Sequence, residues 1–229
     1  MSNIQFIRGI LYSLFYCNIS DIFLSKTTGL NRKAKWYLIH TICNFFILNH
    51  SFNDMMITFT NPIQSFTSDN YNSKGLEIVV GLHLYHIMRD AYILDYIDWC
   101  HHLISCFFMA IIGFVCYHNA AFNCGLFFMC GLPGCIDYFL LFLVKINLFD
   151  KLTEKNVNVF LNNWIRCPGI LYSVSATNVG YLLGYIDMHP LLYIISQFLV
   201  TFNAIFFAER VTLNYGYYLD LTEGMNDFI

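Results

Sequence analysis

The sequence predicts an all-α protein, a polytopic bundle of six to seven transmembrane helices that encloses a polar cavity open toward the cytosol. The first observation is composition: the 229 residues are 57% hydrophobic and only 12% charged, whereas soluble domains carry about 25% charged residues. The second is the recurrence of apolar stretches of about 20 residues, the length that crosses a bilayer. The third is a cluster of ionisable side chains within residues 81–106, in otherwise apolar surroundings.

Seven stretches have the length and composition of a membrane span. They cover approximately residues 4–24, 36–59, 75–97, 101–117, 120–148, 157–185 and 191–211. The first is the most diluted by polar residues and could instead lie at the membrane interface, which would leave six spans. We expect a tight turn over residues 95–100. We also expect Pro133 and Pro168 to interrupt the fifth and sixth spans, because proline removes a helical hydrogen bond.

Two short basic segments orient the predicted bundle. Residues 25–35 and 149–156 carry most of the lysine and arginine found between spans, and such loops remain on the cytosolic side. Seven spans then place the N-terminus outside and the C-terminus in the cytosol. We divide the chain into an N-terminal span with its basic loop (1–31), a membrane domain (32–213) and a short acidic cytosolic tail (214–229).

Charge and cysteine content exclude some function classes. The net charge of −3 provides no basic surface for nucleic acid. The 9 cysteines form no C-x-x-C pair, which favours buried free thiols over disulfides or a zinc site. The sequence is compatible with an oligomer.

Ionisable side chains on the third predicted span are the first candidate site. His83, His86 and Asp90 are spaced three and then four residues apart, so they share one helical face. A histidine close to a carboxylate suits proton transfer, and such a face could also bind a lipid headgroup or supply metal ligands. Interhelical hydrogen bonding is the structural alternative. Intramembrane ionisable residues are functional by default, and no H-E-x-x-H motif is present.

Further polar residues complete the candidate set. His101 and His102 open the fourth predicted span and point about 100° apart, with helix capping or snorkelling as the structural alternative. Arg166 lies within a span and should have a partner, for which Asp137 or Asp90 is suitable. Lys145 is expected to reach toward the cytosolic surface.

The order of these features resembles the TLC-domain family, which includes ceramide synthases, translocon-associated TRAM proteins and smaller TLC-domain proteins. A basic loop leads into an aromatic-led helix, Arg32-Lys33-Ala34-Lys35-Trp36, followed by His40. Asp90 precedes His101-His102-Leu103. A glycine-bearing apolar stretch follows over residues 113–145, and Arg166 precedes Ile170-Leu171-Tyr172. The resemblance covers roughly residues 33–210.

The resemblance implies lipid chemistry at the histidine pair. In ceramide synthases the double histidine belongs to the site that transfers an acyl group from acyl-CoA to a sphingoid base, and this role falls on His101 and His102. The family's His-Asp dipeptide is absent here, and Asp137 and Lys145 are the remaining equivalents. In length the chain is closer to the small TLC-domain proteins, which are associated with lipid composition, trafficking or sensing.

The sequence therefore predicts a multi-pass protein of an endomembrane, of the endoplasmic-reticulum type, that handles a membrane lipid. His83, His86, Arg166 and Lys145 would bind the lipid, and no cofactor or metal is expected. The first alternative is a ceramide-synthase-like N-acyltransferase with acyl-CoA as co-substrate. It would use His101 or His102 as base or nucleophile, oriented by Asp90 or Asp137. The second alternative is a metal-dependent lipid hydrolase or hydroxylase that uses His83, His86 and His102.

Overall fold

A computed structural model describes residues 3–67, 72–116 and 119–226, and these residues form helices with no strand among them. The all-α prediction is confirmed. The helical segments, π-helical ones marked η, are α1 (Asn3–Thr27), α2 (Arg32–Thr60), α3 (Gln64–Thr67), α4 (Lys74–Asp90), α5 (Tyr96–His101), η1 (His102–Phe108), α6 (Met109–Cys116), α7 (Ala120–Leu126), η2 (Phe127–Gly131), α8 (Leu132–Lys145), α9 (Lys151–Phe160), η3 (Leu161–Arg166), α10 (Cys167–Leu182) and α11 (Pro190–Asn226).

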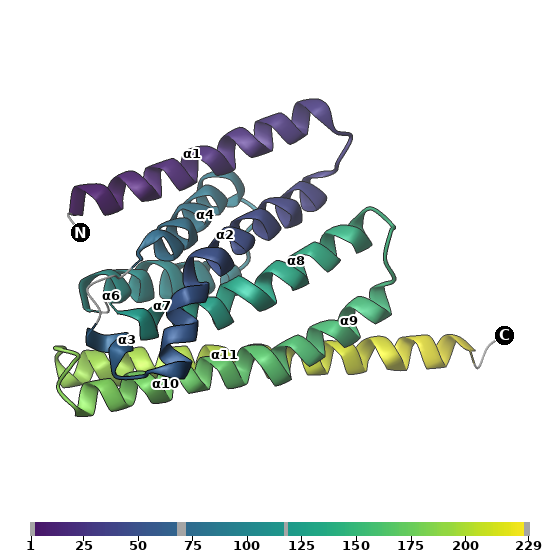
Figure 1. The fold of residues 1–229 in the computed structure, drawn as a ribbon. Coiled ribbons are helices and arrows are strands. Elements are labelled where there is room, and N and C mark those ends of the chain that lie inside the picture. Colours follow the sequence, from purple (N-terminus) through teal and green to yellow (C-terminus); the bar gives the residue numbers. More distant parts are fainter. Residues whose placement is uncertain (1–2, 68–71, 117–118, 227–229) are drawn as a thin grey trace.

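Apart from the short α3, the described segments join into seven rods, a rod being an uninterrupted run of helical residues. The rods are α1, α2, α4, α5–η1–α6, α7–η2–α8, α9–η3–α10 and α11. They run back and forth between the two ends of the molecule, with the chain termini at opposite ends (Figure 1). Two stretches, Ala120–Lys145 and Pro190–Asp220, are long and apolar enough to cross a membrane, each with a mean hydropathy of 1.9. These two stretches indicate association with a membrane.

Two segments predicted to be a turn and a loop are mostly helical, and in both cases an aspartate explains the difference. The turn expected over residues 95–100 is mostly helix, because Asp95 and Asp98 form a capping box that starts α5 at Tyr96. The loop expected over residues 149–156 is mostly α9. The Asp150 carboxylate accepts hydrogen bonds from the backbone N–H and the hydroxyl of Thr153, at 2.7 and 2.9 Å. These bonds lower the pKa of the Asp150 carboxyl below its ordinary value.

The two rods in which Pro133 and Pro168 were predicted to interrupt the helix continue past these prolines. Pro133 and Pro168 occupy the first turns of α8 and α10, directly after the π-helical segments η2 and η3. A proline in the first turn of a helix is tolerated, because the N–H there has no partner within that helix. The wider π-helical turn carries the chain past the proline, and both rods continue.

Helix α2 is the centre of the bundle, in contact with α1, α4, α7 and α8. Glycines allow close approaches between rods: a Cβ atom on Gly81 of α4 would lie 2.5 Å from Ser13 Cβ of α1, and one on Gly131 would lie 3.1 Å from Leu48 Cα of α2. Helix α1 therefore packs lengthwise on α4 and does not lie across the end of the bundle (Figure 1).

The distribution of side chains differs from that of a soluble helical bundle. Among the described residues, nearly as many polar or charged side chains are buried as apolar ones, including Glu154 and Asn123, which are 0% and 1% exposed. Large apolar side chains such as Trp164 and Phe198 are 73% and 64% exposed. Contiguous exposed apolar surface indicates contact with a partner or a membrane.

Candidate functional site

Five histidines from three rods gather on one side of α2. They are His40 of α2, His83 and His86 of α4, His101 at the end of α5, and His102 at the start of η1. They separate into two groups by their hydrogen bonds. We call His40 and His86 the closed pair, and His83, His101 and His102 the open group.

The closed pair belongs to a ring of hydrogen bonds with Trp36. The indole Nε1–H of Trp36 donates to His86 Nδ1 over 2.7 Å. His86 Nε2 lies 2.9 Å from His40 Nε2, and His40 Nδ1 lies 2.9 Å from the carbonyl oxygen of Trp36. The circuit begins and ends on the same residue.

The bonding partners fix the tautomers of both rings. An indole can only donate and a carbonyl can only accept, so His86 Nδ1 carries no proton and His40 Nδ1 carries one. The remaining contact then has a single solution, in which His86 Nε2–H donates to an unprotonated His40 Nε2. Both imidazoles are therefore neutral, and all four ring nitrogens are occupied.

Aromatic packing holds the closed pair in place. The His40 ring stacks on His86 with centroids 4.4 Å apart and on Tyr138 of α8 with centroids 4.2 Å apart. Trp36 packs against Tyr138 edge to face at 5.6 Å. His86 is 1% exposed and His40 is 7% exposed. The closed pair thus joins α2, α4 and α8 in one buried contact.

Two histidines of the open group, His83 and His102, each have a ring nitrogen for which the described residues supply no hydrogen bond. His83 Nδ1 lies 2.7 Å from the carbonyl oxygen of Val79, one turn earlier in α4. Because this carbonyl can only accept, His83 Nδ1 holds the proton and the neutral ring presents a lone pair on Nε2. His102 Nδ1 is buried and has no hydrogen-bond partner among the described residues. The His83 ring lies 5.5 Å from that of His101 and 5.2 Å from that of His102.

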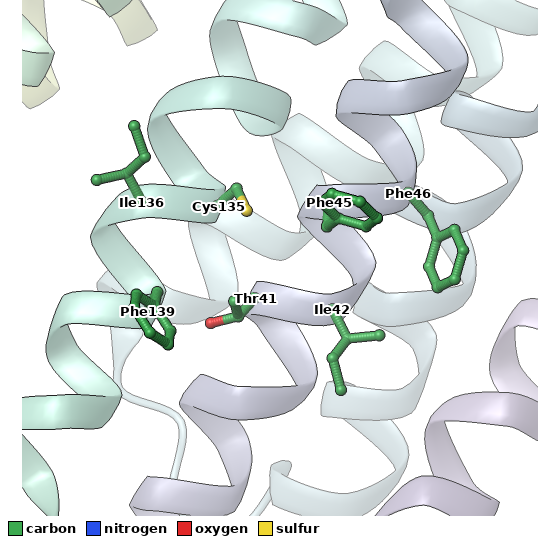
Figure 2. A pocket seen from close by; sticks show the side chains of 7 residues that line it. All are labelled: Thr41, Ile42, Phe45, Phe46, Cys135, Ile136 and Phe139. Atoms are coloured by element: carbon green, nitrogen blue, oxygen red, sulfur yellow. The ribbon is translucent and has the colours of Figure 1, made fainter.

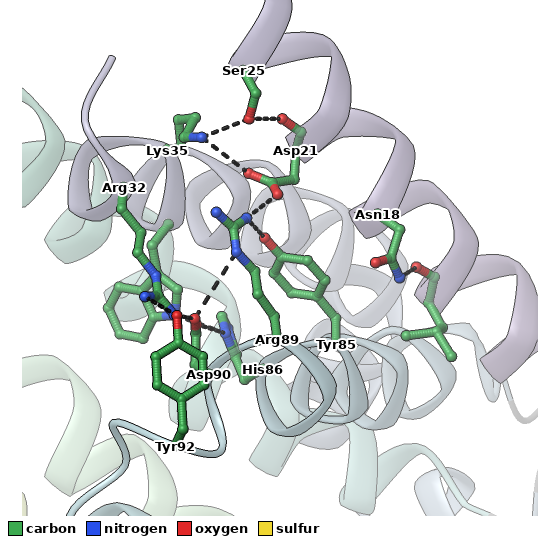
Figure 3. Close-up of polar contacts among 12 residues, drawn as sticks. Asn18, Asp21, Ser25, Arg32, Lys35, Tyr85, His86, Arg89, Asp90 and Tyr92 are labelled. Carbon is green, nitrogen blue, oxygen red and sulfur yellow. Dashed lines mark hydrogen bonds and ion pairs between the residues drawn. The ribbon is translucent and has the colours of Figure 1, made fainter.

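Asp90 has no described contact with any of the three histidines of the open group. Its carboxylate pairs with Arg32 of α2 (Figure 3). The histidine close to the Asp90 carboxylate is His86, whose Nδ1 is 3.8 Å away and already accepts a hydrogen bond from Trp36. His86 in turn lies 6.1 Å from His102, measured between ring centroids. One histidine therefore separates Asp90 from the predicted catalytic pair.

Charged side chains form a network at the same end of α1, α2 and α4 (Figure 3). Asp21 pairs with Arg89 and lies 3.7 Å from Lys35 Nζ, while Arg89 also donates to the Tyr85 hydroxyl over 2.5 Å. Lys35 donates to Ser25 Oγ over 2.6 Å. This network closes the end of the bundle beside the closed pair and includes no histidine of the open group.

Arg166 lies at the end of η3 and shares a contact residue, Phe207, with the open group. Its Nε donates to the carbonyl oxygen of Met129 over 3.2 Å, and its Nη2 donates to Asn203 Oδ1 over 2.6 Å. Its guanidinium carbon lies 4.9 Å from the ring centre of Phe207, and His101 packs against the same ring at 6.1 Å. The expected ion pair with Asp137 or Asp90 is absent among the described residues. The Nη1 of Arg166 is buried and has no partner there.

A proline explains why a backbone carbonyl accepts a bond from Arg166. Pro133 has no N–H to donate to the carbonyl four residues before it in the chain, which is that of Met129. This carbonyl lies within η2, which contacts η3. With no N–H at position 133 to compete for it, this carbonyl accepts the Arg166 Nε–H.

The remaining predicted residues lie apart from the histidines. Asp137 of α8 has a buried Oδ1 with no hydrogen-bond partner in the described part of the chain. It precedes Tyr138 in α8, and no described hydrogen bond or ion pair joins it to a histidine. Lys145 is exposed at the last turn of α8, and no described contact joins it to a histidine.

The described residues contain no group of three or more His, Cys, Asp and Glu side chains arranged to hold a metal ion. Of the histidines in the metal-site alternative, His86 already uses both ring nitrogens within the closed pair.

Two grooves lie on the outside of the bundle, and neither is lined by a histidine. The first, of about 470 Å³, runs between α2 and α8 (Figure 2) and is lined by Thr41, Ile42, Phe45, Phe46, Cys135, Ile136 and Phe139. The second, of about 310 Å³, lies where η3 and α10 meet α11 and is lined by Asn163, Cys167, Ile205, Ala208, Glu209, Thr212 and Leu213. The first groove follows the outer face of the contact that holds His40 against Tyr138.

Sequence reasoning missed Trp36 and Tyr138 as partners of the closed pair, and Asn203 and Phe207 as partners of Arg166. Trp36 had a detectable signal, because it precedes His40 by one helical turn and so shares a face with it. Asn203 was a polar residue in an apolar span, which signals a hydrogen bond between helices.

Comparison with known proteins gave no match to a protein-family model, to a curated protein or to a solved structure.

Proposed function

We propose that this chain is a multi-pass membrane protein of the TLC type that binds a lipid with its polar end at the open histidine group. The observation that carries the proposal is the contrast between the two histidine groups. The closed pair has every ring nitrogen occupied, whereas His83 Nε2 has a lone pair and His102 Nδ1 is buried without a partner. Buried polar atoms usually have a partner, so we infer that a ligand supplies one.

The membrane setting of the proposal rests on the outer surface as well as on the two apolar helices. Large apolar side chains are exposed along α1, α2 and α11, while α2 buries the polar side chains of His40, Asn44 and Asp54. With seven rods crossing a bilayer, the charged network of Arg32, Lys35 and Arg89 would lie at the cytosolic end. An endomembrane of the endoplasmic-reticulum type would be its location.

Mass spectrometry of lipid extracted from the purified protein tests the proposal. We expect a stoichiometric lipid with the wild type, and its loss from the double variant His101→Ala/His102→Ala. His189→Ala is the matched control, since His189 is exposed in the connection between α10 and α11. A double variant that folds and retains the same lipid would disprove binding at the open group.

Acyl transfer is the second candidate function, and the tautomer of His83 favours it. A neutral imidazole with a lone pair on Nε2 can act as a base or as a nucleophile toward an acyl thioester, and His83 adjoins both His101 and His102. A labelled acyl-CoA supplied with a sphingoid base tests this function. N-acyl product from the wild type and none from His83→Ala would support it, while bound lipid without turnover would favour a carrier or sensor.

A further inference from the structure

Arg166 is the buried charge that the histidine site does not account for. The residue is 8% exposed, and its Nη1 has no hydrogen-bond partner among the described residues. A buried cation without a counter-charge is costly, and no described carboxylate forms an ion pair with it. The two bonds it makes are to neutral groups, the Met129 carbonyl and the Asn203 amide oxygen.

These two bonds hold the guanidinium in a fixed orientation. Nε is bound by η2 and Nη2 by α11, so two of the three nitrogens are occupied and Nη1 is the one that remains. Phe207 lies against one side of the group at 4.9 Å. Because Arg presents its donors in a rigid planar fork, fixing two nitrogens also fixes the direction in which the third donates.

The free nitrogen belongs to the same region as the open group. Phe207 contacts both the Arg166 guanidinium and the His101 ring, and His101 adjoins His83. A ligand whose polar end reaches the histidines therefore comes near a positive charge. A guanidinium forms its strongest hydrogen bonds with an oxyanion, either a carboxylate or a phosphate.

We propose that Arg166 is an anion-binding residue and that the polar end of the bound lipid is a carboxylate or a phosphate. This inference rests on the proposed lipid-binding function and adds the charge of the ligand. Arg166 Nη1 would donate to the oxyanion, with Asn203 and the Met129 carbonyl positioning the guanidinium. Asp137 is the nearby acid on α8 with its own unpartnered Oδ1, and its negative charge would oppose the anion.

Equilibrium binding to the purified protein in lipid nanodiscs tests this with four probes. Oleate and oleyl phosphate carry the two anionic groups, oleyl alcohol carries the same chain without charge, and inorganic phosphate carries the charge without a chain. We expect the wild type to bind the two anionic lipids at least ten-fold more tightly than oleyl alcohol. Competition by inorganic phosphate would identify a site for free anions, and its absence would identify a site for a lipid headgroup.

Three variants assign the preference to Arg166. Arg166→Met should reduce the ten-fold preference to about one while retaining the binding of oleyl alcohol. Arg166→Lys keeps the charge but not the fork and should reduce the preference at least three-fold. Arg8→Gln removes an exposed charge from α1, which no described hydrogen bond or ion pair joins to Arg166, and should leave the preference unchanged.

The outcomes separate this inference from the function on which it rests. The anion site is overturned if the wild type binds oleate, oleyl phosphate and oleyl alcohol equally well. It is also overturned if Arg166→Met keeps the preference for the anionic lipids. Both results leave lipid binding itself intact. Failure of all three lipids to bind overturns the proposed function itself. If Arg166→Met does not fold, Arg166→Lys decides, because an unchanged preference in that variant contradicts the assignment.

Asp137→Asn tests the alternative that Arg166 is balanced by Asp137. Removing the negative charge should leave the binding of oleate unchanged or strengthen it, since the carboxylate opposes the anion. A ten-fold loss of oleate binding in this variant, with oleyl alcohol unaffected, would show that Asp137 supports the site and would overturn the proposed charge arrangement.

Discussion

The closed pair and the open group are built from the same side chain on neighbouring rods, yet their chemistry differs. His86 and His40 share one hydrogen bond, and each also bonds Trp36: His86 through the indole N–H and His40 through the backbone carbonyl. In the open group, His83 Nδ1 donates to a backbone carbonyl of its own helix, and His102 Nδ1 is buried without a partner among the described residues. A buried histidine is therefore available for function only when its neighbours leave a ring nitrogen unoccupied.

Removing His86 should give the largest loss of stability. The change His86→Ala leaves the Trp36 indole without an acceptor and His40 Nε2 without a donor. Each buried group without a partner costs about 1–3 kcal/mol, so we expect the free energy of unfolding to fall by about 4 kcal/mol. Circular dichroism during unfolding in one detergent measures this, with His189→Ala as the control. A loss below about 1 kcal/mol would show that the ring of hydrogen bonds is not closed.

The change Trp36→Phe should break one bond of the closed pair and keep most of the aromatic packing. Only His86 Nδ1 loses its donor, so we expect the free energy of unfolding to fall by about 2 kcal/mol. This loss is smaller than that of His86→Ala and larger than that of His83→Ala. The same unfolding experiment ranks it. If Trp36→Phe were as stable as the wild type, the indole hydrogen bond and the tautomers derived from it would be incorrect.

Removing His83 should have a smaller effect on stability and a large effect on ligand binding. The change His83→Ala deletes a bond within α4 worth about 1 kcal/mol and removes the nitrogen that faces the open group. We expect loss of co-purified lipid from a folded protein, measured by mass spectrometry beside the unfolding curve. The opposite ranking, with more stability lost than in His86→Ala and the lipid retained, would reverse the roles of the two groups.

Replacing His102 should affect stability least of all. The change His102→Leu replaces a buried unpartnered polar atom with an apolar side chain of similar size, which is nearly neutral or stabilising. We expect a change within about 0.5 kcal/mol, together with weaker lipid binding. A loss of 2 kcal/mol or more would mean that His102 Nδ1 is already satisfied in the folded protein, and the open group would then be smaller than described.

Much of the helical pattern could be predicted from the sequence, because hydropathy and charge are local properties. The basic segment before Trp36 lies at the start of α2, and the apolar stretches predicted to begin at residues 120 and 191 begin at Ala120 and Pro190. The last helix continues to Asn226, well beyond the predicted end at residue 211. The errors occurred where a side chain starts a helix. Asp95 and Asp150 cap the helices that follow them, and both segments had been interpreted as turn or loop because they are polar.

The candidate site was only partly predictable. Spacing correctly placed His83, His86 and Asp90 on one helix, but Asp90 pairs with Arg32, which lies 58 positions away in the chain. The expected partners of Arg166 were acids, and its partners are a carbonyl and an amide from other rods. Pairings between rods depend on how the rods pack, and the spacing of residues along one helix does not contain that information.

Composition and hydropathy indicated a helical chain in which the ionisable cluster of residues 81–106 and Arg166 lie among apolar stretches. Which histidines have their hydrogen bonds satisfied depends on how the rods pack. Hydrogen bonding is directional and each ring nitrogen takes one partner, so the approach of Trp36 and His40 to His86 occupies that ring completely. The same packing leaves His83, His102 and Arg166 with unoccupied nitrogens, and these are the atoms on which both proposals rest.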